Sequence, residues 1–432
     1  MQSEIKFIDG GVTAATGFTA NGVLSHIKAS RKTNDTALIY SEKMCSAAGV
    51  FTQNRVKAEP VKLTKKNIAN GRIQAVIANS GNANCCTGEQ GAKVAYHMAQ
   101  LAGKELGVSP DDVIVCSTGV IGQQLPVEKI EEHISELAKG LSKEGHKEAR
   151  IAIMTTDTQY KEVAVETTIG GKTVKMGAMC KGSGMIHINL GTMLSFITTD
   201  CAISPAMLEK ALRDTVAGTY NCVSVDGDTS TNDTLVILAN GMAGNAEITS
   251  ENDDYKAFQA ALYSMCEVMA MKIAADGEGA TRLIECTVQG AKDVDTARGL
   301  AKEVIGSNLV KAAMFGKDAN WGRILCAMGY SGYEFTPEKT CVYFSSRTGA
   351  KRYFDSASGV KPEISGCDKC GGKIEVFHNG VPLNFDEDKA KKILSEEAVE
   401  ILVTLEDGSA EGKAWGCDLT YDYVKINGDY RT

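Results

Sequence analysis

The sequence predicts a mixed protein, α/β or α+β, in which helices cover β-sheets in layers. Two observations lead to this prediction. Short runs rich in β-branched residues alternate along the chain with longer segments whose apolar residues recur every three or four positions. No internal repeat or low-complexity linker interrupts this order. The length of 432 residues is enough for two or three domains and a sizeable core.

In the first part of the chain, strands and helices are predicted to alternate. The predicted elements are strands at residues 74–79 and 112–117, helices at 89–106 and 128–141, and a β-structure at 160–174. The helix at 128–141 has its apolar residues on one face. The last segment contains Gly170-Gly171, which predicts a hairpin turn.

The second part continues the mixed pattern. A strand is predicted up to Thr199, and Ser204 is the expected cap of a helix that begins at Pro205. Further helices are predicted at residues 255–275, 300–311 and 386–402, the last one rich in Glu and Lys at i, i+4 spacing. A change from helical to strand pattern near residue 285 suggests two domains, 1–285 and 286–432.

Composition restricts the function. A net charge of −8 without a basic stripe disfavours a nucleic-acid partner. No apolar run approaches the roughly 18 residues that span a bilayer, and residues 1–6 do not resemble a signal peptide. We therefore expect a cytoplasmic protein without a membrane partner.

The 14 cysteines are scattered, and we interpret most of them as small buried apolar residues. Cys367-Asp-Lys-Cys370 is different, because Cys-x-x-Cys can be half of a zinc site or a redox motif. Cys341 and His378 lie within reach in the sequence. Two free thiols at a surface turn are the favoured interpretation, and a small zinc knuckle stays open. The surrounding residues 347–372 are predicted to form an excursion between two strands.

The most informative segment is residues 181–194, a glycine-rich run followed by an apolar strand. If the bond before Thr192 were cleaved, this threonine would carry a free α-amine beside its own hydroxyl. Such an amine, with a pKa of about 7.7–8.0, can act as base for the hydroxyl. A glycine loop entering a buried strand is the simpler explanation when the segment is considered alone.

Four further polar, glycine-containing segments follow strands or helices. They span residues 79–84, 117–122, 226–234 and 275–281. Each one is explained equally well by a turn or a helix end. Residues 117–122 could instead present a hydroxyl and a glycine N–H to an oxyanion. Residues 226–234 alternate oxygen-bearing side chains, but Ile237 stands where a calcium-binding loop needs its glutamate, which excludes an EF-hand.

Together these segments resemble the ornithine acetyltransferase family, the ArgJ-type glutamate N-acetyltransferases of arginine biosynthesis. The resemblance covers nearly the whole chain. It also includes Met154 to Thr158, Phe315 to Ile324 and the terminal Tyr423 to Thr432. It implies a four-layer α-β-β-α core of the ArgJ/DmpA-like type with a smaller C-terminal α/β domain. It further implies self-cleavage between Gly191 and Thr192 and assembly of two α and two β fragments.

The resemblance also implies roles for individual residues. Thr192 corresponds to the nucleophile that takes an acetyl group from N-acetylornithine and passes it to glutamate, without a cofactor or a catalytic metal. Thr118 and Gly119 correspond to the oxyanion hole. The positions that correspond to substrate contacts are Thr155, Lys181, Thr192, Glu278, Asn427 and Thr432. Lys181 suits a carboxylate and Glu278 suits the amino group of ornithine. Some members also use acetyl-CoA, and the sequence leaves this donor open.

The chain departs from the family pattern near the cleavage bond. Gly191 stands where alanine is usual, and we expect cleavage to persist because glycine is smaller and freer. His187-Ile188-Asn189 replaces the Ala-Pro-Asn of many members, which predicts a looser approach to the bond.

Two alternatives to the transferase are kept. The first is an N-terminal-nucleophile amidohydrolase or aminopeptidase, in which water replaces glutamate as acceptor. The second is a non-catalytic small-molecule binding protein in which the bond before Thr192 stays intact. The match at Asn427 to Thr432 favours the transferase, because it suits recognition of an amino acid.

Overall fold

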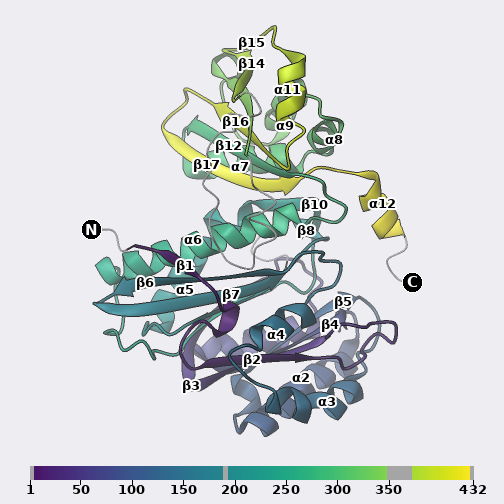
Figure 1. Ribbon diagram of the computed structural model, residues 1–432, viewed down its shortest axis with the longest axis vertical. Helices are drawn as coiled ribbons and strands as arrows, with labels where there is room; N and C mark the ends of the chain where they lie inside the picture. The colour runs from purple at the N-terminus through teal and green to yellow at the C-terminus, as the bar shows by residue number, and fades with distance from the viewer. Residues whose placement is uncertain (1–3, 188–192, 348–371, 429–432) are drawn as a thin grey trace.

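The computed structural model describes residues 4–187, 193–347 and 372–428. Its strands form two sheets (Figure 1). In the nine-stranded sheet, β2 (Phe18–Val23) pairs with β3 beside the main path. The order along that path is β1 (Lys6–Ile8), β6 (Lys161–Ile169), β7 (Lys172–Lys181), β9 (Leu194–Thr199), β11 (Thr234–Ala239), β3 (Thr36–Phe51), β4 (Arg72–Asn82) and β5 (Val113–Val120).

The eight-stranded sheet is built mainly from the C-terminal part of the chain. Its order is β15 (Val381–Pro382), β14 (Ile374–His378), β13 (Cys341–Ser346), β16 (Ala398–Thr404), β12 (Leu283–Ala291), β17 (Ala410–Cys417), β10 (Val223–Thr229) and β8 (Ile186–His187). The predicted domain boundary, residue 285, lies within β12. Two strands of this sheet, β8 and β10, come from the part of the sequence that precedes this boundary. The division into two domains stays a prediction.

The nine-stranded sheet folds over on itself, because its two halves bury a shared inner face. Phe196 of β9 and Ile39 of β3 belong to this inner cluster. On one outer face, Ile197 packs with α5 (Pro205–Gly218) and α6 (Asp253–Ala275). On the other outer face, Ile77 packs with two helices, α2 (Gly88–Leu106) and α3 (Val127–Lys139).

These layers confirm the predicted α-β-β-α fold class. Figure 1 shows α6 above β6 and β7, with β2 and β3 below them and α2 and α3 at the bottom. Two short helices complete this part of the molecule. α1 (Glu59–Asn67) contacts β5 and α2, and α4 (His146–Ala152) contacts β2 and β3.

Helix α6 joins the two sheets. It contacts β6 of the first sheet and β10, β12 and β17 of the second. A helix enclosed in this way is apolar on most of its circumference, and Met265, Val268, Met269 and Ile273 are all fully buried. Its C-terminal end is Ala275, so the polar residues that follow emerge between the sheets.

Two predicted helices are wrong in part. Residues 300–311 belong to two helices, α7 (Val294–Gly306) and α8 (Asn308–Gly316), because the Ser307 hydroxyl accepts a hydrogen bond from the Val310 amide and starts a new helix. Residues 386–402 form α11 (Glu387–Ile393) and then β16. The strand buries Val399, Ile401 and Val403 at a period of two, and its parallel pairing with β12 decides the structure.

The other predicted elements are present with end shifts of a few residues. The turn at Gly170-Gly171 joins β6 and β7, and both glycines have positive φ. Strands β13 and β14 flank residues 347–372, and most of this excursion, with Cys367 and Cys370, lies outside the described residues. Ten of the twelve described cysteines are buried, which agrees with their interpretation as small buried apolar residues. Within the described ranges, no helix has the length and apolarity to cross a membrane.

Candidate active site

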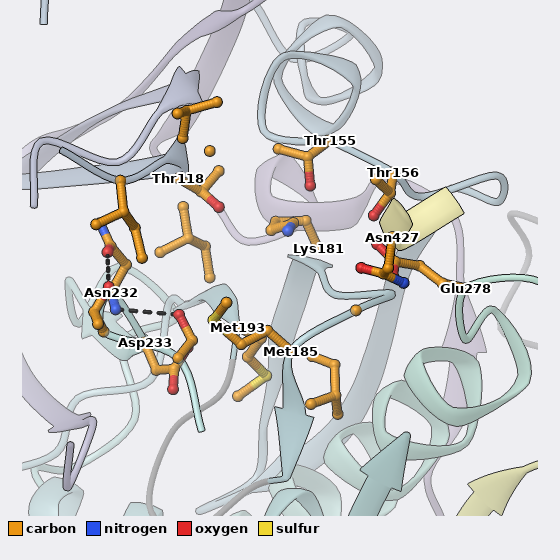
Figure 2. A pocket seen from close by; sticks show the side chains of 18 residues that line it. Thr118, Thr155, Thr156, Lys181, Met185, Met193, Asn232, Asp233, Glu278 and Asn427 are labelled. Atoms are coloured by element: carbon orange, nitrogen blue, oxygen red, sulfur yellow. Dashed lines mark hydrogen bonds between the residues drawn. The ribbon is translucent and has the colours of Figure 1, made fainter. Parts of the chain in front are cut away.

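Six of the predicted site residues line one pocket of about 380 Å³. They are Thr118, Gly119, Thr155, Lys181, Glu278 and Asn427. Figure 2 shows Glu278 and Asn427 at one end of this pocket, Asn232 and Asp233 at the opposite end, and Lys181 between them. Gly191, Thr192 and Thr432 lie outside the described residues, and Met193, the residue after Thr192, lines the pocket.

Thr118 and Gly119 lie where β5 ends beside β4. The pairing of the two strands becomes irregular at Gly81 and Asn82. Gly119 has φ +133°, and a Cβ at this position would stand 2.3 Å from the carbonyl carbon of Gly81. Only glycine fits this close approach of two backbones. The arrangement leaves the Thr118 side chain half-buried at the pocket wall.

Asn232 fixes the end of β5 from the opposite side. Its Nδ2 donates to the carbonyl oxygens of Ala83, at 2.6 Å, and Ser117, at 2.8 Å. Ser117 in turn donates through its hydroxyl to Asn79 Oδ1 at 2.6 Å. These buried polar groups are therefore satisfied, and the 226–234 segment is tied to the predicted oxyanion position.

Lys181 ends β7 and is 7% exposed. Its Nζ lies 4.0 Å from Asp157 Oδ2. Asp157, whose side chain is fully buried, also accepts from Lys161 Nζ at 2.7 Å and from the Gly182 amide at 2.7 Å. Lys161 forms a second ion pair with Asp276. The four charges form a continuous network that holds the end of β7 at the pocket.

This network sets the charge state of its members. Burial opposes ionisation of Asp157, but the positive charges of Lys161 and Lys181 outweigh it and lower the pKa of the carboxyl. Burial likewise opposes the charge of Lys161, and Asp157 and Asp276 overcome it and raise the pKa of the ammonium. Both groups are therefore charged at neutral pH, and Lys181 faces the pocket as the remaining cation of the network.

Glu278 follows α6 and is 6% exposed. Its amide donates to the Ser183 carbonyl at 3.0 Å. Gly184 allows this packing, because a Cβ there would stand 2.3 Å from the Glu278 carboxyl carbon. From α12 (Tyr421–Gly428), Asn427 Nδ2 donates to Glu278 Oε2 at 2.7 Å. The C-terminal helix therefore closes one end of the pocket.

Asp233 is a pocket residue to which the sequence assigned no role. It is 2% exposed, it accepts a hydrogen bond from the Met193 amide, and burial raises the pKa of its carboxyl well above the ordinary value. Among the described residues, Asp233 Oδ2 has no hydrogen-bond partner. The only sequence signal was its place in the 226–234 segment. Asp157 was missed in the same way within Met154 to Thr158.

His187, at the departure from the family pattern, is anchored. Its Nδ1 lies 3.0 Å from Ser224 Oγ, and its carbonyl accepts from Thr229 Oγ1 at 3.2 Å. Burial, with a smaller contribution from Lys302, lowers the pKa of His187 to about 4, so the imidazole is neutral at pH 7. The predicted looser approach to the cleavage bond stays a prediction, because Ile188 and Asn189 are outside the described residues.

Three groups with different binding properties lie along this pocket. A glycine-bearing strand end can donate to an oxyanion, a cation can hold a carboxylate, and a carboxylate with an amide can hold an ammonium group. Among the described residues that line the pocket, the ionisable side chains are Lys181, Asp233 and Glu278. Such a site suits a small zwitterionic molecule with an acyl group.

Comparisons with known proteins identify relatives over nearly the whole chain. A model of the ArgJ family matches residues 19–432. The "Arginine biosynthesis bifunctional protein ArgJ" of Symbiobacterium thermophilum is 48% identical over 431 residues, which cover 99% of this chain and 100% of the relative. The protein of the same name in Bacillus subtilis is 44% identical over 432 residues, covering 100% and 99%.

Two solved structures are also similar to this chain. The ArgJ bifunctional protein of Bacillus halodurans is 43% identical with a TM-score of 0.47, covering 54% of this chain and 98% of that one. An ornithine acetyltransferase of Mycobacterium tuberculosis, complexed with ornithine, is 38% identical with a TM-score of 0.40, covering 43% and 99%. The family model and the full-length relatives show that this chain belongs to the ArgJ family.

Proposed function

We propose that this chain transfers the acetyl group of N²-acetyl-L-ornithine to L-glutamate, with Thr192 as the acetyl carrier. The observation that carries the proposal is the shared pocket, in which Thr118 and Gly119 lie near Met193 and together with Lys181 and Glu278. Membership of the ArgJ family supports it, because relatives at 44–49% identity are named arginine biosynthesis bifunctional proteins.

The reaction begins with maturation of the chain between Gly191 and Thr192, which frees the Thr192 α-amine. In the first half-reaction this amine takes the proton of the Thr192 hydroxyl, and Oγ attacks the acetyl carbonyl. Thr118 and Gly119 donate to the resulting oxyanion. The C–N bond then breaks, the proton passes to the leaving amine, and ornithine departs from an acetyl ester on Thr192.

In the second half-reaction the amine of glutamate attacks the ester and regenerates the Thr192 hydroxyl. Lys181 holds the substrate carboxylate, with Thr155 beside it in the pocket wall. Glu278 and Asn427 hold the side-chain amine of acetylornithine. Thr432 completes the substrate contacts. Acetyl-CoA is the second donor, which gives the chain two activities.

The same proposal extends to the assembled protein. Maturation leaves an α fragment of 191 residues and a β fragment of 432 − 191 = 241 residues. Two copies of each form an α2β2 assembly in the cytoplasm. Pairing of β7 with β9 and of β8 with β10 joins strands from both sides of the cut, so the fragments stay together after cleavage.

Intact mass spectrometry tests maturation and the acetyl carrier together. The purified protein should give two fragments that begin at Met1 and Thr192, whereas a Thr192→Ala variant should give one full-length chain. Brief incubation with N-acetylornithine should add one acetyl group to the β fragment only. A full-length wild-type chain with full ligand binding would instead identify a non-catalytic binding protein.

Steady-state kinetics separate transfer from hydrolysis. A ping-pong transferase releases ornithine much faster when glutamate is present, and acetylglutamate accumulates in equal amount. Release of ornithine and acetate at the same rate with and without glutamate would contradict the proposal and identify an amidohydrolase. Replacing acetylornithine by acetyl-CoA in the same assay tests the second donor.

A further inference from the structure

Three side chains with metal-binding atoms converge at the edge of the eight-stranded sheet, away from the active site. Cys341 comes from β13, and Glu375 and His378 come from β14. One ligand atom of each lies within 4.8 Å of the others. Along the sheet, five strands separate β14 from β8, which carries the pocket residue Ile186. Figure 1 shows β14 and β15 at the top of the molecule, far from β4 and β5.

The backbone explains why these residues meet. In a regular strand, residues 375 and 378 would point to opposite faces of the sheet. The pairing of β13 with β14 shifts register here, since Val342 pairs with Phe377 whereas the next residue, Tyr343, pairs with Glu375. Such a bulge redirects side chains and brings Glu375 and His378 to the same side as Cys341.

The turn after β14 places a further polar group beside these three side chains. Asn379 and Gly380 both have positive φ, which matches a tight hairpin into β15. The turn brings Asn379 Oδ1 to 3.4 Å from Cys341 Sγ. The sulfur is thus surrounded by an imidazole, a carboxylate and an amide oxygen, although Cys341 itself is 7% exposed.

The distances suit a tetrahedral metal ion. Cys341 Sγ lies 3.6 Å from His378 Nδ1, and this nitrogen lies 2.7 Å from Glu375 Oε1. Around tetrahedral zinc, with bonds of about 2.3 Å to sulfur and about 2.0 Å to nitrogen, the two atoms stand about 3.5 Å apart. Glu375 has to withdraw from Nδ1 by less than about 1 Å to reach the matching position, and its side chain is partly exposed, so this movement is open to it.

A Cys–His catalytic pair explains the geometry less well. In such a pair, the imidazole uses one nitrogen toward the thiol and the other toward the carboxylate that orients it. Here both neighbours face the same atom, His378 Nδ1. One nitrogen cannot donate to Glu375 and accept from Cys341 at once, whereas its lone pair can share a metal ion with both.

The donor set indicates the kind of metal. A thiolate and an imidazole favour Zn²⁺ over Mg²⁺ or Ca²⁺, which prefer oxygen ligands throughout. We propose that Cys341, Glu375 and His378 bind a zinc ion that joins β13 to β14, with water as the fourth ligand. Binding releases the thiol proton and uses the lone pair of Nδ1, the ring proton lying on Nε2, and it stabilises the strand pair that carries the excursion at residues 347–372.

Cobalt is the probe that tests this site in the full-length protein. After treatment with a chelator, the protein is titrated with Co²⁺ and then with Zn²⁺ against a coloured competing chelator. The expected result is one Co²⁺ for each chain, a thiolate-to-cobalt charge-transfer band, and displacement of cobalt by zinc. Zinc should also raise the thermal unfolding temperature of the wild type.

Variants assign the signal to the site. Cys341→Ser should abolish the charge-transfer band, and His378→Ala should weaken zinc binding at least tenfold. His378 is exposed, so its variant should fold normally. Cys326→Ser removes an exposed cysteine elsewhere and should change nothing. Wild-type zinc affinity in both Cys341→Ser and His378→Ala would overturn the proposal.

The Cys367/Cys370 pair needs a control of its own, because the sequence places it close to Glu375. The double variant Cys367→Ser/Cys370→Ser should keep the charge-transfer band. If this double variant loses all metal binding while Cys341→Ser retains it, the metal belongs to the Cys pair and the proposed site is wrong.

Discussion

Asn427 donates a hydrogen bond to the carboxylate of Glu278 at 2.7 Å, although 149 residues separate the two in the sequence. The bond joins α12 to the segment that follows α6. Asn427 contacts Oε2, so this bond does not occupy the second carboxylate oxygen of Glu278. The C-terminal helix therefore contributes to the pocket through a side chain that orients a charged group.

Asn427→Ala should weaken substrate binding. Removing a hydrogen bond to a charged group costs about 1.5–3 kcal/mol, so we expect kcat/KM for N-acetylornithine to fall roughly 10- to 150-fold, mostly through KM. Steady-state kinetics measure this change. Val424→Ala on the same helix, where the side chain is 68% exposed, is the control and should leave both constants unchanged. An equal loss in both variants would indicate that α12 acts only through its packing.

Asp157→Asn should destabilise the fold, because it leaves two buried lysines with less negative charge. Breaking a buried ion pair by removing one partner costs about 3–5 kcal/mol, measured here by urea unfolding at pH 7. Asp253→Asn is the matched control, since this carboxylate pairs with Lys256 but is 97% exposed. No measurable change is expected in the control.

The same variant should alter the acid limb of stability. The folded-state pKa of Asp157 is lowered, so its contribution is complete above the ordinary value of 3.8 and is lost as pH falls toward the folded-state pKa. Stability of the wild type should therefore decrease below pH 3.8 more steeply than that of Asp157→Asn. Parallel curves for the two proteins would show that the carboxyl is not ionised in the folded state.

Local sequence patterns predicted most elements in which the apolar residues follow a single helical or strand periodicity. The helix at 128–141 has one apolar face, and the structure forms α3 from it. The pattern failed at residues 398–404, because the Glu- and Lys-rich spacing of residues 386–402 had predicted a solvated helix. There, pairing with the distant strand β12 decided the structure, and the local sequence pattern carries no information about that partner.

The candidate site could be predicted only from the resemblance to a family. Thr118, Lys181 and Glu278 come from different elements, and sequence spacing does not bring them together. The supporting residues Asp157 and Asp233 were missed because buried carboxylates look like surface ones in a sequence. The burial of their side chains and the partners they contact distinguish them, and both are tertiary properties.

Thr118→Ala should reduce catalysis with little effect on binding. The hydroxyl donates to the oxyanion only as it develops, so kcat should fall about 10²- to 10³-fold with KM nearly constant. Thr156→Ala, which removes another hydroxyl from the same pocket, is the control and should have a smaller effect on kcat. A change confined to KM would contradict the role assigned to Thr118.

Asp233→Asn should separate stability from activity. Burial raises the folded-state pKa of Asp233, so between the ordinary value of 3.8 and that raised pKa an increase in pH favours the unfolded chain. Asparagine keeps an acceptor for the Met193 amide and does not ionise. The free energy of unfolding at pH 7 should therefore rise, by about 0.5–2 kcal/mol, when measured by urea unfolding.

Activity should change in the opposite direction. Met193 follows Thr192 directly in the chain, and the Asp233 carboxyl accepts a hydrogen bond from the Met193 amide, so Asp233 contacts the neighbour of the proposed nucleophile. We expect the transfer rate of Asp233→Asn to fall at least tenfold, and the pH dependence of kcat to shift with it. If kcat stays unchanged while the free energy of unfolding rises, Asp233 has no catalytic role and only destabilises the folded protein.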